Sequence, residues 1–186
     1  CRRPLGRRRF CVSARWGRRL VGYDLDLIRG GLSHGAVDPI YGWLVPEGQL
    51  CRVMELRGDE FLAMISQLAP SQAHGIALSL CDALTYLCSI GVSLRELLPS
   101  QVAVIEGGAL LYAPEVGGVE GSPLRGAALS RSAELIGRLL VLMIPPGQSP
   151  LGDILSEATA GRFSSPEGLK GALLALEERD RSAQGA

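Results

Sequence analysis

The strongest hydrophobic pattern along the chain is a set of apolar positions at helical spacing in its middle third. These positions follow a period of about 3.6 residues: Ile76, Leu80, Ala83, Leu84, Leu87 and Ile90. The pattern predicts an amphipathic helix over 71–90, and Gly91 is a typical stop after it. A strongly apolar helix is predicted over 129–144, and a last helix over 165–178, because the latter opens on Ser-Pro-Glu.

Strands are expected where apolar and polar residues alternate. The alternation predicts one strand over 9–16, a hairpin over 39–56 and a smaller hairpin over 102–112. Two short helices and a glycine-rich loop complete the pattern: 23–32, 59–68 and 117–126. Strands mixed with helices, followed by a helical C-terminal half, predict an α+β fold.

Composition and charge narrow the possible classes of protein. With 186 residues, 47% of them hydrophobic, the chain can build one compact domain with a core. Its net charge is zero, but eight of its arginines stand in the first 20 residues, which hold no acid. Lys170 is the only lysine. No apolar stretch approaches the roughly 18 residues that a membrane span needs, so we expect none.

Cysteine and histidine give no sign of a metal site or a disulfide framework. The five cysteines are an odd number and form no C-x-x-C pair, which favours reduced thiols and a cytoplasmic setting. His34 and His74 lack ligand spacing with each other or with a cysteine. Neither G-x-x-x-x-G-K-[ST] nor G-x-G-x-x-G occurs. We therefore expect no metal and no cofactor.

Six segments, taken in order, resemble a protein kinase of the serine/threonine type over about 32–176. Residues 32–56 are similar to the end of the regulatory helix and to strands four and five of the kinase small lobe. Residues 83–92 are similar to the end of the kinase central helix. The next segment, 94–101, reads Leu-Arg-Glu-Leu-Leu-Pro-Ser-Gln and resembles a degraded HRDLKPSN catalytic loop.

The other three segments resemble later parts of the kinase sequence. Residues 112–116, Tyr-Ala-Pro-Glu-Val, are similar to the end of the activation segment, and 131–140 to the buried helix that follows it. Residues 161–167 resemble the late segment whose arginine pairs with the glutamate of the activation segment. The resemblance thus implies a structural ion pair between Glu115 and Arg162.

The catalytic positions that the resemblance identifies have changed. Arg95 matches the family pattern, but Glu96 replaces the catalytic aspartate. Leu98 replaces the catalytic-loop lysine, and Gln101 replaces the magnesium-binding asparagine. The strand-three lysine falls near Arg15, and the chain is too short at this point for a metal-binding DFG segment and an activation loop. Kinase chemistry depends on positioning and neutralising phosphates, so the resemblance implies a pseudokinase with no intact catalytic, cofactor or metal site.

This interpretation divides the chain into three parts. Residues 1–56 are expected to be the remnant of a small β lobe, a hairpin plus a short helix, above a mainly helical C-terminal lobe at 57–178. Residues 179–186 are expected to form a flexible tail. The predicted function is that of a catalytically inactive module for protein binding, scaffolding or regulation, whose partner is another protein or domain.

Three alternatives stay open at this stage. A diverged but active phosphotransferase would use Glu96 as its base and Arg15 as a phosphate clamp. An α+β domain of another family would bind nucleic acid through the arginine-rich arm, although we expect a protein partner instead. Locally, Ser93-x-x-Glu96 is also a capping box for a short helix, which needs no kinase ancestry.

Overall fold

The fold is mixed α+β, as the hydrophobic pattern predicts. The computed structural model describes these residues: 10–14, 35, 37, 40–44, 51–55, 60–112, 116–120, 122–144 and 149–184. Within them the strands are β1 (Phe10–Ala14), β2 (Ile40–Leu44), β3 (Cys51–Glu55), β4 (Glu60–Phe61), β5 (Val92–Leu94), β6 (Val102–Ile105), β7 (Gly108–Leu111) and β8 (Val116–Val119). The helices are η2 (Leu62–Met64), α2 (Pro70–Ser89), η3 (Pro99–Gln101), α3 (Ala127–Val141), α4 (Pro150–Thr159) and α5 (Pro166–Gln184).

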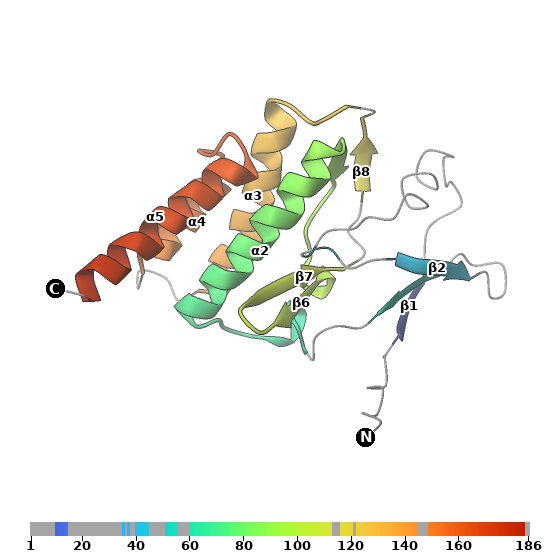
Figure 1. The fold of residues 1–186 in the computed structure, drawn as a ribbon, viewed down its shortest axis with the longest axis horizontal. Helices are drawn as coiled ribbons and strands as arrows, with labels where there is room; N and C mark the ends of the chain where they lie inside the picture. The colour runs from blue at the N-terminus through green and yellow to red at the C-terminus, as the bar shows by residue number, and fades with distance from the viewer. Residues whose placement is uncertain are drawn as a thin grey trace, which may run out of the picture.

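Helix α2 is the centre of the helical part. It begins with Pro70, whose missing N–H costs nothing at a helix start. It ends where Gly91 takes φ +80 and donates its N–H to Cys88 O at 3.1 Å. Its apolar face packs against α3 and α5, and α3 packs against α4 (Figure 1). The predicted helix at 71–90 and its glycine stop are confirmed.

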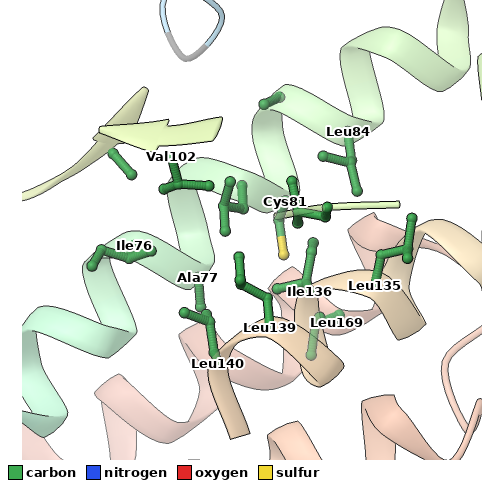
Figure 2. Close-up of a cluster of buried hydrophobic side chains, with 14 of the residues drawn as sticks. Ile76, Ala77, Cys81, Leu84, Val102, Leu135, Ile136, Leu139, Leu140 and Leu169 are labelled. Carbon is green, nitrogen blue, oxygen red and sulfur yellow. The ribbon is translucent and has the colours of Figure 1, made fainter. Parts of the chain in front are cut away.

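The hydrophobic core lies between these helices and the β6–β7 hairpin. Figure 2 shows Cys81 of α2 among leucine and isoleucine side chains of α3 and α5, with Val102 of β6 nearby. Burial in this apolar cluster raises the pKa of the Cys81 thiol to about 12. Two polar links add to the apolar contacts between α2 and α5. His74 Nε2 lies 3.0 Å from Leu173 O, and the only lysine, Lys170, places Nζ 2.5 Å from Asp82 Oδ1.

Three small antiparallel sheets complete the fold. The first has the order β1-β3-β2, the second β4-β6-β7, and the third pairs β5 with β8. The sheet that holds β1 and β2 lies on the far side of the β6–β7 hairpin from α2 (Figure 1). The hairpin turn approaches α2 closely, because a Cβ on Gly75 would lie 2.6 Å from Gly107 O. The predicted strand at 9–16 and the two predicted hairpins are confirmed.

Two predicted local structures are wrong, and in both a distant strand decides the outcome. The stretch 59–68 was expected to be a helix, but β4 pairs with β6, with Glu60 opposite Val104, and only η2 is helical. The stretch 117–126 was expected to be a loop, but its first part belongs to β8, which pairs with β5. Gly117 permits this pairing, since a Cβ there would lie 2.9 Å from Arg95 N.

The other differences concern helices. Helix α4 was not predicted, although Ser149 caps it by accepting from Gly152 N–H at 3.4 Å. Helix α3 ends at Val141 and not at 144, and the turn after it accepts the Leu68 N–H at Met143 O, 2.9 Å away. Helix α5 continues to Gln184, so the prediction of a tail from 179 was wrong over those residues. The predicted helix at 23–32 lies outside the described residues.

Candidate binding groove

The segment that resembles a catalytic loop forms a tight turn after β5. Pro99 fixes the first backbone angle of η3, and Gln101 N–H donates to Leu98 O at 2.9 Å. The Gln101 side chain closes the same turn, because its Oε1 accepts the Leu98 N–H at 2.9 Å. Gln101 is only 8% exposed, and its own carbonyl accepts from Tyr112 N–H. Gln101 is therefore a structural residue whose side-chain oxygen is already used.

The alternative of a capping box at Ser93 is wrong. Ser93 lies in β5, and its Oγ donates to Gly118 O of β8 at 3.2 Å. Glu96 follows the strand without starting a helix. The local sequence signal is real, but the strand pairing with β8 takes the serine out of a helix-capping position.

An open groove of about 510 Å³ lies between this turn, η2 and helix α3. Arg95, Glu96 and Leu98 line it from the turn. Helix α3 contributes Arg131 and Arg138, and apolar residues of η2, of the turn, of α3 and of the turn after α3 form the floor of the groove. These floor positions are nearly buried: Leu62, Leu97, Leu135, Leu139 and Met143. The groove thus combines an apolar floor with charged side chains at its rim.

The charges of α3 at the groove are arranged around one acid. Glu134 Oε1 accepts from Arg131 Nη1 at 3.0 Å, and Arg138 Nη2 contacts the same oxygen. The hydrogen bond from Arg131 and the charge of both guanidinium groups hold the pKa of the Glu134 carboxyl below its ordinary value. Within the described part of the chain, neither Arg95 nor Glu96 has a hydrogen-bond or ion-pair partner for its side chain.

The structure brings together three of the residues that sequence reasoning selected. Arg95, Glu96 and Leu98 share the groove, whereas Gln101 is buried beside the turn. Arg162 is exposed at the start of the α4–α5 connection and does not line the groove. Glu115 and Arg15 lie outside the described residues, so the ion pair of Glu115 with Arg162 stays a prediction.

Sequence reasoning missed Arg131 and Arg138. Both stand on a helix that was predicted from its apolar positions, and their spacing of seven residues places them on one face of that helix. With Glu134 between them, the spacing i, i+3, i+7 is a signal for a charged stripe. What the sequence alone does not give is the neighbour of that stripe, the turn at 95–99.

Nucleophilic or metal chemistry finds little support among the described side chains. No group of three His, Cys, Asp or Glu residues there is placed to hold a metal ion. Burial raises the pKa of the Cys81 and Cys88 thiols, and Cys88 Sγ lies 3.3 Å from Ser132 Oγ inside the core. A thiol with a raised pKa is a weak nucleophile at neutral pH.

Comparison with known proteins adds no relative. No family model matches the sequence, and no curated protein matches it. Among the described helices, none is both long and apolar enough to cross a membrane.

Proposed function

We propose that this chain is a catalytically inactive, protein kinase-like module that binds another protein. The observation that carries the proposal is the state of Gln101. At the position where the resembled catalytic loop holds a magnesium-binding asparagine, the side-chain oxygen accepts a backbone N–H at 2.9 Å and the residue is buried. The Gln101 side chain thus supports the turn from within, which favours a structural role over metal binding.

The order of the elements supports the resemblance. A long helix, α2, is followed by β5, by the turn at 95–101 and by a small hairpin, which is the succession that the six matching segments imply. Glu96 stands in the connection after the long helix, as a degraded catalytic loop would place it. The proposal of kinase ancestry rests on this succession together with the sequence segments.

The single lysine supports the absence of catalysis. A kinase uses a lysine of its small lobe to hold the nucleotide phosphates. Here Lys170 belongs to α5, and its ammonium group is paired with Asp82 of α2. Leu98, which replaces the catalytic-loop lysine, is apolar and contributes to the groove lining. Phosphate charge in the groove would therefore meet arginine side chains only, two of which already contact Glu134.

The test is a thermal unfolding titration with ATP and Mg²⁺. A nucleotide bound at a hundred times its Kd would raise the Tm by about 5–10 °C for a chain of this size. We expect no rise beyond that given by MgCl₂ with sodium tripolyphosphate at the same ionic strength. A rise that requires both ATP and Mg²⁺ would contradict the proposal.

The active-phosphotransferase alternative has one observation in its favour, which is that Glu96 lines the groove and its side chain has no partner among the described residues. It is tested by transfer of radiolabel from ATP to a mixture of protein substrates. Transfer that falls at least tenfold in Glu96→Ala but persists in the control Glu106→Ala would support that alternative. We expect no transfer above background from either variant or from the parent chain. The nucleic-acid alternative rests on arginines outside the described residues and stays a prediction.

A further inference from the structure

One strongly exposed apolar side chain lines the groove, and a second stands next to lining residues in the sequence. Among the described residues three large hydrophobic side chains are strongly exposed, namely Met64, Leu142 and Leu174. Leu142 is 86% exposed and lines the groove, and Met64, 71% exposed, stands in η2 between two residues that also line it. Single exposed leucines are common, but apolar groups concentrated at a concave site are typical of binding surfaces.

The charge of the rim points to the chemistry of the partner. Among the described residues that line the groove, Arg95, Arg131 and Arg138 are cationic and Glu96 is the one acid. Even with Glu134 included, the cations outnumber the acids. Arg95 is exposed, and its guanidinium group has no partner among the described residues. Arginine presents a planar fork that fits a carboxylate, and with apolar anchors it dominates many protein interfaces.

We propose that this groove docks a short segment of a partner protein that carries an apolar anchor side chain flanked by carboxylates. The anchor inserts between Leu142 and the floor formed by Leu135 and Leu139, and a carboxylate pairs with Arg95. Basic segments are rejected, because their charges would meet the three arginines. This inference rests on the proposed function, since it assumes a protein partner.

The size of the groove favours a segment over a globular face. A volume of about 510 Å³ is within the usual range of sites that enclose small ligands or a few side chains. Its floor is already nearly buried, so an inserted side chain completes a packed layer at little cost in reorganisation. The guanidinium group of Arg95, which lines the same groove, then orients the bound segment.

The experiment is a selection from random dodecapeptides displayed on phage, with the full chain as the target. We expect enrichment of peptides that combine a large apolar residue with Asp or Glu. Affinities of the enriched peptides are then measured by fluorescence anisotropy. Arg95→Glu and Leu142→Glu should each weaken binding by about tenfold or more. High salt should also weaken binding of these peptides.

Matched controls lie elsewhere on the same chain. Arg125→Glu changes an exposed arginine away from the groove, and Leu174→Glu changes an exposed leucine of α5. Both should leave the affinity unchanged. Circular dichroism and Tm of all four variants should match the parent chain, because none of these side chains is buried.

Several outcomes would overturn the inference. They are the absence of enrichment, enrichment of basic peptides, or acidic peptides that bind all variants equally. Sedimentation analysis adds another: a concentration-dependent dimer that is lost in Leu142→Glu would show that a second copy occupies the groove. None of these results bears on the titration with ATP and Mg²⁺, so failure of the groove inference and failure of the proposed function are distinguishable.

Discussion

The two faces of helix α3 differ in how far they bury similar side chains. One face packs into the core, where Ile136 and Leu140 have no exposed surface (Figure 2). The other face carries Arg131 and Arg138 along the groove, and Leu142, the first residue after the helix, also lines it. Leu140 and Leu142 are two residues apart, yet one is fully buried and the other is 86% exposed.

The comparison shows which face of the helix is already packed in the folded chain. On the core face the apolar side chains of α3 belong to the buried core cluster, and Gly137 allows α4 to approach closely. On the groove face apolar and cationic groups lie together along an open groove, with no other described segment packed over them. The fold leaves Leu142 exposed, and the docking segment proposed above would cover it. The predictions below test this division.

The largest difference is expected between two leucine truncations. Leu140→Ala removes a fully buried side chain and should lower the free energy of unfolding by about 2–5 kcal/mol. Leu142→Ala removes an exposed side chain and should change it by no more than about 0.5 kcal/mol. Urea unfolding followed by circular dichroism measures both. Similar losses for the two variants would mean that Leu142 packs against the fold and that the groove is not an open surface.

A second contrast compares two glycines inside helices. A Cβ on Gly137 would lie 2.6 Å from Thr159 N and 2.7 Å from Leu155 O, so Gly137→Ala must push α3 and α4 apart. We expect a loss of about 1–3 kcal/mol. Gly171 of α5 has open space around its Cβ position. Gly171→Ala should therefore gain about 0.5–1 kcal/mol from helix propensity. A gain at both positions, in the same unfolding assay, would contradict the close contact of α3 with α4.

Much of the helical part could be predicted from local signals. The apolar period of α2 and the Gly91 stop are such signals, and so is the cap of α5, where Ser165 Oγ accepts from Gly168 N–H at 3.1 Å. Helix α4 opens on the same Ser-Pro pair and could have been found in the same way. Gly152 in its first turn and its short length weaken the apolar pattern there.

What could not be predicted depends on contacts between distant segments. β4 and β8 are strands because β6 and β5 provide their hydrogen-bond partners. The sequence of β4 is too short, and that of β8 too rich in glycine, to predict a strand. The residues of the candidate site also divide into those that a local motif identifies and those that only the fold brings together. Arg95, Glu96 and Leu98 were found because they are neighbours in a motif. Arg131 and Arg138 join them only because the fold places α3 beside the turn.

The smallest effect on stability is expected for the charged side chains of α3 at the groove rim. Glu134→Gln removes the acid that Arg131 and Arg138 share, and these side chains are partly exposed, so the loss should be only about 0.2–1 kcal/mol at neutral pH. Because the folded chain lowers the pKa of Glu134 below its ordinary value of 4.5, this stabilisation is present above that value. It should disappear as the pH falls through the lowered pKa, and also in about 1 M salt.

Urea unfolding at neutral and acidic pH measures this loss, with Glu157→Gln as the control, because Glu157 has no side-chain ion pair among the described residues. Glu134→Gln also tests the difference between the two faces of α3. Without Glu134 the guanidinium groups of Arg131 and Arg138 are free to bind an external carboxylate. Glu134→Gln should therefore tighten the binding of acidic peptides at the groove while it slightly weakens the fold. If Glu134→Gln weakened both peptide binding and the fold, Glu134 would be needed to hold the arginines in their binding positions.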